Sequence, residues 1–430
     1  MTLKAQHAVV LAVVLATGLV LAACGPKAPP PAPVGPTYYG DIQPLLGQHC
    51  TMCHTANGIA PFTLETFASA SQMATVMASA TTAKVMPPWP PDDACNSYHG
   101  DRSLADADIA LIKQWAAAGA PEGAVTSTGT NPADQSAANP LGRSPDLVVS
   151  MPQPYVSPPT ADTDDYHCFV IDPMLTTEQD VVGVQVVPGN ARIVHHVILY
   201  EVETANVPQL EQLDPTGQGY TCFGDAHVQA NWVAAWAPGG TAEKFPDTTG
   251  IRLHPGSKLV MQVHYNLLNG RDLSDQSQVQ LYFSPMPVQN VATIQPIAQY
   301  AFDLAAGAKD VEVPFTYTVT PDVGTLHVWG VAGHMHLLGT AWKMWVEPAS
   351  GPTECLLHLP VWNFHWQNMY FLDNPVTLNP GDTVHMSCVY DNSQAHQPII
   401  QGVQQTARDV TWGESTTDEM CLGLVYLTSG

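Results

Sequence analysis

The sequence predicts a mainly β protein in which two antiparallel β-sandwich domains follow a small α-helical domain. After Asp146, short alternating apolar runs such as VVGVQVV, KLVMQVHYNLL and VQLYFS are separated by Pro, Gly, Asn and Asp residues. Strands at this density, with few helices between them, are typical of antiparallel sandwiches rather than of a parallel sheet. Because residues 144–430 exceed the length of one ordinary sandwich, we expect two, 144–288 and 289–430, divided within SPMPVQN.

The helical domain is predicted from the residues before this change, over 39–124. In the segment 105–118 (ADADIALIKQWAAA), Ile109, Ile112 and Trp115 fall on one face of a helix. The GAP that follows is a stop signal.

The composition limits the partners of the protein. The chain holds 14 Lys and Arg against 38 Asp and Glu, a formal net charge of −24 at pH 7. Such an acidic surface repels nucleic acid and anionic lipid head groups, so we expect no nucleic-acid partner. Hydrophobic residues make up 45% of the chain, which is enough for sizeable cores.

The N-terminus carries the pattern of an export signal. After Lys4, an apolar run extends from Ala8 to Ala23 and ends in Leu-Ala-Ala-Cys at Cys24. The run is short for a membrane-spanning helix and typical of a signal-peptide core. Its ending resembles the bacterial lipobox, in which the cysteine is acylated, and cleavage after an Ala-x-Ala sequence is the alternative. We expect residues 1–24 to be a lipoprotein-type signal peptide and the protein to be a lipoprotein of the bacterial cell envelope, in the periplasm or anchored to the outer membrane.

Two segments without a helix or strand pattern separate these parts. Residues 25–38 form a proline-rich, semi-rigid tether, so the membrane would be a partner only through the lipid anchor. Residues 125–143 are rich in Gly, Ser, Thr, Asn and Pro and are predicted to be a linker.

The predicted helical domain contains the motif CxxCH, formed by Cys50, Cys53 and His54. Two thiols at this spacing add across the vinyl groups of haem, and the adjacent histidine binds the iron. Half of a zinc site is the alternative, but no second CxxC follows at the spacing of a zinc ribbon. Together with export, the motif predicts a covalently attached haem c.

A sixth haem ligand is expected from Met86, because the prolines of KVMPPWPP fix the chain around it. Met73, Met77 and His99 compete for this role. The stretches CHTANGIAPFTL, MPPW and IKQWAAAGAPEG resemble small class I-like cytochrome c domains attached to bacterial enzymes. The resemblance implies a cytochrome c-like fold for the helical domain.

The remaining cysteines predict disulfides. Of nine cysteines, one is predicted to be lipidated and two to bind haem, which leaves six. In an oxidising compartment six cysteines can form up to three bridges.

Histidines recur on the predicted strands. RIVHHVILY places His195 and His196 side by side, although successive side chains of a strand point to opposite faces. Packing alone explains a single buried histidine with one hydrogen-bond partner, whereas a metal could recruit both if the strand ends or twists there. His264, in MQVHYN, lies on another strand.

GHMHLLG is a stronger metal-binding pattern. His334 and His336, two residues apart on a strand, share one face and form a two-ligand clip for copper or zinc. A solvated polar strand face is the alternative, but the apolar segments WGVAG and LLG that flank the motif argue against it.

In this order, RIVHHVILY, LVMQVHYN, GHMHLLG, SCVYDN and DEMCLGLVY resemble the copper type II, ascorbate-dependent monooxygenases, the peptidylglycine α-hydroxylating and dopamine β-monooxygenase family. The resemblance covers residues 144–430 and implies two jelly-roll sandwiches, each with one copper ion. It assigns the first copper to His195, His196 and His264, and the second, catalytic copper to His334, His336 and Met420. From the residues alone, Met420 would be interpreted as part of the core.

The chemistry fits this assignment. A thioether favours Cu(I), the state that must meet O2, and three imidazoles suit a copper ion that cycles electrons. Hydroxylation of a C–H bond with O2 requires two electrons, one from each copper. We therefore expect a copper-dependent monooxygenase that hydroxylates a small molecule and receives electrons from its haem domain, with an ascorbate-like reductant or a redox protein as donor. A non-enzymatic copper or haem redox protein, or a copper-handling protein, is the alternative.

The resemblance also implies disulfide pairs and neighbours of the first copper. It pairs Cys168 with Cys222 and Cys388 with Cys421, and it places Tyr166 and Gln262 near the first copper. Cys95 and Cys355 are left over, and an interdomain bridge between them is one possibility.

Two departures from the family bear on the substrate. The peptide-amidating members hold a substrate carboxylate with an Arg and a Tyr, and the corresponding positions here are Ala332 and Leu424. Loss of the cation and the phenol makes a peptide carboxylate a poor substrate. We expect instead a neutral or weakly polar molecule. Surface or hydrogen-bonded roles are expected for His49, His167, His227, His254, His358, His365, His385 and His396, and Trp362 and Trp366 are expected to build the second sandwich.

Overall fold

A computed structural model describes residues 35–56, 60–125, 141–159, 163–237, 240, 242–400 and 402–430. The predicted signal peptide with Cys24, most of the tether and most of the linker lie outside the described residues. None of the helices in the described part is long and apolar enough to cross a membrane. The prediction of a mainly β protein with few helices is confirmed.

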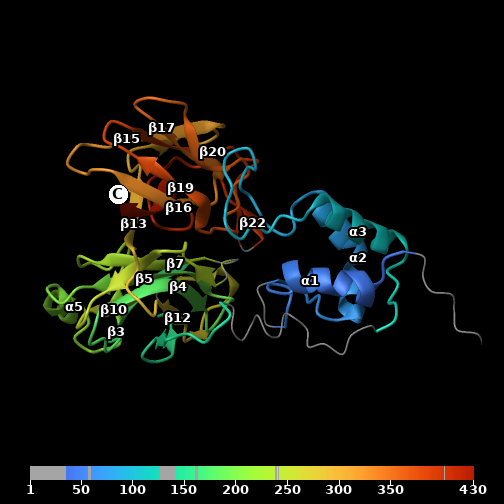
Figure 1. The fold of residues 1–430 in the computed structure, drawn as a ribbon, viewed down its shortest axis with the longest axis horizontal. Helices are drawn as coiled ribbons and strands as arrows, with labels where there is room; N and C mark the ends of the chain where they lie inside the picture. Colours follow the sequence, from blue (N-terminus) through green and yellow to red (C-terminus); the bar gives the residue numbers. More distant parts are fainter. Residues whose placement is uncertain are drawn as a thin grey trace, which may run out of the picture.

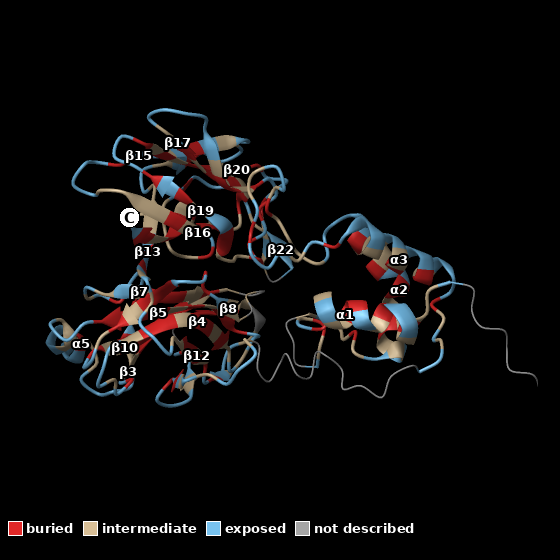
Figure 2. Cartoon of the chain, in the orientation of Figure 1, coloured by how far each residue is buried: buried red, intermediate tan, exposed pale blue. Residues whose placement is uncertain are grey.

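The chain forms a helical module beside two stacked β domains (Figure 1). The module lies at one end of the molecule, and the two β domains lie one above the other at the opposite end. Buried residues concentrate on the strands inside each β domain and on the inward faces of the helices (Figure 2). The helices of the module are η1 (Tyr38–Ile42), a π-helical turn, α1 (Gln43–His49), α2 (Phe67–Thr82) and α3 (Asp106–Ala117).

The module has its own apolar core. Ile112 and Trp115 of α3 are buried, and Ile109 packs against the same cluster, as the periodicity predicts. Nε1 of Trp115 donates a hydrogen bond to the carbonyl of Pro121 at 3.0 Å, so the polar end of the indole is satisfied. Helix α2 begins with a capping box, in which the side chain of Thr66 accepts from the backbone N–H of residue 69.

The first β domain consists of two sheet layers. One layer has the order β1-β12-β4-β9 and the other β7-β5-β10-β3-β6. Its elements are β1 (Leu147–Ser150), β2 (Tyr155–Val156), β3 (Asp164–Ile171), β4 (Gln179–Val187), β5 (Val194–Val202), α5 (Val207–Leu213), β6 (Tyr220–Thr221), β7 (Asn231–Trp236), β8 (Glu243–Lys244), β9 (Thr249–Leu253), β10 (Lys258–Asn266), η2 (Leu267–Asn269), β11 (Ser274–Asp275) and β12 (Gln278–Phe283).

The second β domain is also layered, with β15-β20-β17-β18 facing a layer that contains β19, β16, β24 and β13. Strand β13 pairs with β7 and β9 of the first domain as well as with β24, so it joins the two domains. Its elements are β13 (Asn290–Ala298), β14 (Asp303–Leu304), β15 (Val311–Thr318), β16 (Leu326–His334), β17 (Gly339–Glu347), β18 (Glu354–Leu359), β19 (Tyr370–Leu378), β20 (Thr383–Tyr390), β21 (Ile399–Ile400), β22 (Val403–Gln404), β23 (Val410–Thr411) and β24 (Leu422–Ser429).

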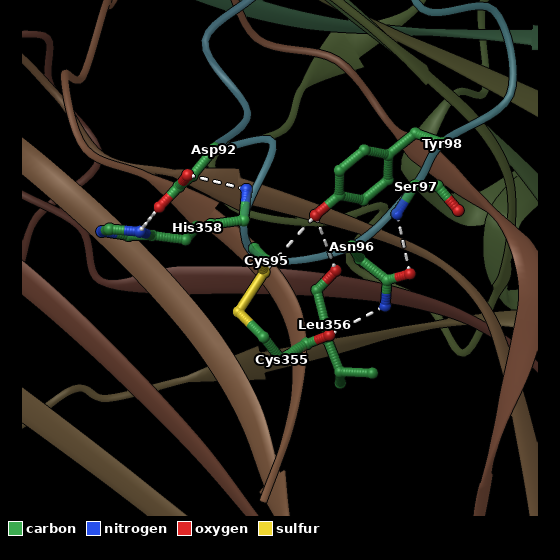
Figure 3. The surroundings of a disulfide bond; sticks show 9 residues. Asp92, Cys95, Asn96, Ser97, Tyr98, Cys355, Leu356 and His358 are labelled. Atoms are coloured by element: carbon green, nitrogen blue, oxygen red, sulfur yellow. Dashed lines mark hydrogen bonds and ion pairs between the residues drawn. A yellow bond between two sulfur atoms is a disulfide. The ribbon is translucent and has the colours of Figure 1, made fainter.

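The chain between α2 and α3 leaves the helical module and packs on the second β domain. We name residues 88–103 the strap. Cys95 of the strap forms a disulfide with Cys355 of β18 (Figure 3). On either side of the bridge, Asp92 contacts Nδ1 of His358 at 2.9 Å, and the hydroxyl of Tyr98 donates to the carbonyl of residue 356 at 3.0 Å. The leftover cysteines therefore join the predicted helical domain to the second predicted sandwich.

Candidate metal centres

The three predicted ligands on β5 and β10 lie together. Nδ1 of His264 lies 3.2 Å from Nδ1 of His195 and 3.3 Å from Nδ1 of His196. The ligand atoms of these residues all lie within 4.8 Å of one another. Nitrogens bound tetrahedrally to a metal at 2.0–2.1 Å are separated by roughly 3.3 Å, so the spacing suits one ion. We name these three residues the first centre.

A β-bulge explains how two adjacent residues of one strand face the same centre. His264 of β10 pairs with His196 of β5, but the next residue, Tyr265, pairs with Val194. His195 is therefore the extra residue of the bulge, and the local bend lets its ring approach the other two. In a regular strand the two adjacent rings would point to opposite faces.

Asp164 of β3 orients the third histidine. Its Oδ1 lies 2.8 Å from Nε2 of His264 and also accepts a hydrogen bond from Oγ1 of Thr416 at 2.7 Å. Burial raises the pKa of Asp164, but hydrogen bonds from His264, Thr416 and Thr163 outweigh it and lower the pKa to about 2. The ionised carboxylate holds a proton on Nε2 of His264, so Nδ1 is left to bind a metal.

The second set of predicted ligands lies at the end of β16. The ring centroids of His334 and His336 are 5.1 Å apart with planes at 86°. Nδ1 of His334 lies 2.6 Å from Oε1 of Gln367, and Nδ1 of His336 lies 3.1 Å from the carbonyl of Asp418. Because each Nδ1 is engaged, each ring presents Nε2 as its ligand atom. Met420 lines the same cavity as these two rings, and we name the three residues the second centre.

Burial keeps four of these histidines neutral, namely His195 and His196 of the first centre and both histidines of the second. It lowers the pKa of His195 and His196 well below the usual value, and repulsion from His264 adds to the effect. It also lowers the pKa of His334 to about 4 and that of His336 to about 3. A neutral imidazole can bind a metal without first losing a proton.

Glu419, which no sequence pattern singles out, fixes the second centre. Its carboxylate accepts hydrogen bonds from the backbone N–H groups of His336 at 2.8 Å and Leu338 at 2.6 Å. Burial raises the pKa of Glu419 to about 8, against the opposing effect of these N–H groups. The same carboxyl thus ties the chain beside Met420 to the chain that carries the histidine pair. In the sequence, the position of Glu419 directly before Met420 is the feature that could have pointed to this role.

A cavity of about 580 Å³ opens onto both centres. Its wall includes Ala332 and Leu424, which pair directly across β16 and β24. Aromatic side chains, among them Trp232, Phe371 and Tyr426, form much of the rest. The two positions that depart from the family therefore lie beside each other in the cavity wall and present only small or aliphatic side chains.

Tyr166 and Gln262 lie beside the first centre. The ring of Tyr166 stacks on that of His264, with centroids 4.1 Å apart and planes at 7°. Gln262 is buried, lines the cavity and donates to the carbonyl of Cys222 at 3.3 Å. The disulfide pairs implied by the resemblance are both present, Cys168–Cys222 and Cys388–Cys421.

The CxxCH motif lines a second, larger cavity of about 1210 Å³. Cys50 and Cys53 are free cysteines, and His54 lines the cavity beside them. Nδ1 of His54 lies 3.1 Å from the carbonyl of Phe62, which leaves Nε2 free to act as a ligand. We name this space the CxxCH cavity.

The candidates for the sixth haem ligand lie in different places. Met86 and Met77 line the CxxCH cavity, whereas Met73 is not part of its described wall. His99 lies 3.5 Å from Asp373 and contacts the second β domain instead.

Among the remaining histidines, several have carboxylate partners, as expected for hydrogen-bonded roles. His49 and His365 differ, because they line the CxxCH cavity. The paired residues are His254 with Glu201, His358 with Asp92 and His385 with Glu347.

Two family models match the chain in sequence. Residues 149–272 match the N-terminal domain of the copper type II ascorbate-dependent monooxygenases, and residues 314–428 match the C-terminal domain. The chain belongs to this family. All six residues of the two centres lie within the matched ranges.

The relatives that this chain resembles include hydroxylases of animals. Dopamine beta-hydroxylase of Bos taurus is 23% identical over 313 residues, which cover 66% of this chain and 45% of that protein. The human enzyme (Homo sapiens) is 24% identical over 65% of this chain and 46% of its own length. Tyramine beta-hydroxylase of Caenorhabditis briggsae is 23% identical over 61% of this chain and 42% of its own length. The chain thus spans less than half the length of these relatives.

Proposed function

We propose that this protein is a copper-dependent monooxygenase that hydroxylates a C–H bond of a small organic substrate with O2. The observation that carries the proposal is that a cluster of three imidazoles, two of which line a cavity, shares that cavity with two further imidazoles and a thioether. Family membership supports copper at both centres, on two domains of the jelly-roll type.

The donor atoms fit copper. The first centre offers three imidazole nitrogens at a spacing that suits one ion. The second offers two nitrogens and a sulfur, and a soft thioether favours the cuprous state. Bound copper would supply one electron at each centre. The chain's own residues orient these ligands, Asp164 through His264 and Glu419 through the backbone of His336.

The cavity wall supports a neutral or weakly polar substrate. Ala332 and Leu424 offer no charge and no hydrogen-bond donor at the positions where peptide-amidating members hold a carboxylate. The aromatic wall favours an apolar or aromatic body.

We further propose a covalently attached haem c on Cys50 and Cys53, with His54 and Met86 as axial ligands, in a cytochrome c-like helical module. The two thiols stay unpaired, whereas the other described cysteines form disulfides. Exposed apolar side chains such as Met86 and Ile399, 42% and 71% exposed, border the cavity and would be covered by a macrocycle. The haem would supply electrons one at a time, and an ascorbate-like reductant or a redox protein would reduce it.

For the cellular location we propose an exported bacterial lipoprotein anchored through Cys24. The N-terminal pattern supports export, and three disulfides suit an oxidising compartment. The net charge of −24 supports the absence of a nucleic-acid partner.

Oxygen uptake tests the activity. Copper-loaded protein supplied with a reductant is offered neutral aromatic and aliphatic compounds, and O2 consumption is compared with hydroxylated product. A monooxygenase couples the two, and copper-free protein forms no product. Slow O2 uptake that no compound accelerates, with no product, would favour a non-enzymatic redox or copper-handling protein.

A further inference from the structure

A short segment between β18 and β19 contacts both metal centres. We name residues 362–367 (WNFHWQ) the bridge segment. Nε1 of Trp362 donates a hydrogen bond to the carbonyl of His336 at 3.1 Å. At the other end, Oε1 of Gln367 lies 2.6 Å from Nδ1 of His334. Both ends of the segment are therefore fixed to the second centre.

The middle of the bridge segment contacts the first centre. Phe364 stacks on His195, with centroids 4.6 Å apart and planes at 20°. Its centroid lies 6.2 Å from that of His336, and its side chain is 7% exposed. Its carbonyl accepts a hydrogen bond from Nε2 of Gln367 at 2.7 Å, which fixes the backbone that carries the ring. The ring of Phe364 thus contacts a ligand of the first centre and is held there by the second.

The bridge segment also forms part of the wall of the CxxCH cavity. Phe364, His365 and Trp366 line that cavity, as do the two thiols of the motif. The guanidinium carbon of Arg102, from the strap, lies 5.4 Å from the ring centroid of Trp366. The Cys95–Cys355 disulfide fixes the strap, which carries Arg102, to β18 (Figure 3).

One histidine connects the cavity to the first centre. His195 lines the CxxCH cavity as well as the cavity shared by the two centres. Among the described residues of the CxxCH cavity wall, it is the only one of the six predicted copper ligands. An electron leaving this cavity therefore meets the first centre before the second.

We propose that the bridge segment carries electrons from a c-type haem in the CxxCH cavity to copper at the first centre, with Phe364 as the positioning residue that connects them. This inference rests on the haem and copper of the proposed function. One electron leaves the ferrous haem, which becomes ferric, and one cupric ion becomes cuprous. No bond forms or breaks and no proton is needed for balance. A stacked aromatic ring fills the space that the electron must cross, and electron transfer slows steeply across an empty gap.

The test follows a single electron without O2 or substrate. Oxidised, copper-loaded, full-length protein is mixed rapidly with one electron equivalent of reductant. Haem oxidation is followed by its visible absorbance, and copper reduction by loss of the cupric electron paramagnetic resonance signal. In Phe364→Leu the rate of haem-to-copper transfer should fall by about tenfold or more. Phe364→Tyr, which keeps the ring, should restore the rate, and Phe364→Met replaces the Leu variant if that protein does not fold.

A neighbouring substitution is the matched control. Val361, 71% exposed and adjacent to the bridge segment, contributes to neither cavity wall, so Val361→Ala should leave the rate unchanged. Covalent haem and copper content are measured for every variant. An unchanged rate in Phe364→Leu, with full haem and copper, would overturn the route and leave the proposed function standing. Absence of covalent haem from the unaltered protein would instead refute the haem proposal, and the route with it.

Discussion

The first centre depends on one irregular residue, His195. The bulge at this position brings its ring to the side of His196, and burial keeps both imidazoles neutral. The identity of these ligands could be predicted from adjacent histidines on a strand and from the family pattern. The bulge could not be predicted from the sequence, because it arises from pairing with β10, which lies about seventy residues away along the chain.

Asp164 should control metal affinity at this centre. Asp164→Asn removes the charge that holds the proton on Nε2 of His264, so copper affinity at the first centre should fall by about 10- to 100-fold. Copper titration followed by paramagnetic resonance measures the change. Asp172→Asn, at an exposed carboxylate paired with Lys258, is the control and should not alter affinity. Equal affinity in the Asp164 variant would contradict the orienting role.

Met420 should be required for product formation but not for copper binding at the first centre. Met420→Ile removes the thioether but keeps an apolar side chain of similar size. Product formation should be lost while one copper ion per chain remains bound to the first centre. Product analysis together with copper content checks this, and full activity would rule out the sulfur as a ligand.

At the scale of elements, the bridge segment shows what sequence patterns miss. Its two tryptophans were expected to build the second sandwich; Trp362 packs in that core, whereas Trp366 lines the CxxCH cavity. Phe364 and Gln367 contact the two centres from an irregular loop. Because such a loop has no periodic pattern of apolar residues, these contacts could not be predicted from the sequence. The strands behave differently, because the alternation that identifies them also determines which residues are buried.

An ion pair between β4 and β9 should stabilise the first β domain in a pH-dependent way. Oδ1 of Asp180 accepts from Nε of Arg252 at 2.9 Å, and its other oxygen accepts from the N–H of Val288 at 2.9 Å. Burial raises the pKa of Asp180, but Arg252 and the N–H of Val288 outweigh it and lower the pKa below the usual value. The contribution is therefore present above the unfolded pKa and lost as the pH falls through the folded pKa.

Asp180→Asn tests this pair. At pH 7 the variant should lose about 2–4 kcal/mol of unfolding free energy. The difference from the unaltered protein should shrink at acid pH, where the carboxyl is protonated in both states. Urea unfolding at the two pH values measures it. Asp247→Asn, at an exposed carboxylate paired with Lys244, should change little at either pH. A loss that does not depend on pH would exclude the ion pair as its cause.

At the scale of the whole molecule, the strap connects the helical module to the second β domain. The sequence predicts two β domains and a helical domain, but composition and periodicity carry no information on how the domains pack together. An interdomain bridge between Cys95 and Cys355 was one possibility for the leftover cysteines, and the structure contains it. The departure of the strap from the helical module was not predicted, because its proline-rich sequence has no strand or helix pattern.

Removing this bridge should loosen the helical module. A double variant, Cys95→Ser with Cys355→Ser, should lose about 2–4 kcal/mol of stability and become more sensitive to proteolysis in the strap. Thermal unfolding and limited proteolysis without reductant measure both effects. Under reducing conditions that cleave this bridge in the unaltered protein, the difference between the two proteins should disappear. Equal resistance without reductant would contradict a structural role for the bridge.

X-ray absorption at the copper edge is the most direct measurement on the two centres. Reduced, fully loaded protein should hold two copper ions per chain and show nitrogen scattering together with a sulfur contribution. That sulfur contribution should vanish in Met420→Ile while the nitrogen scattering remains. A single copper ion per chain, or a sulfur signal that survives the substitution, would show that these residues do not form the two centres.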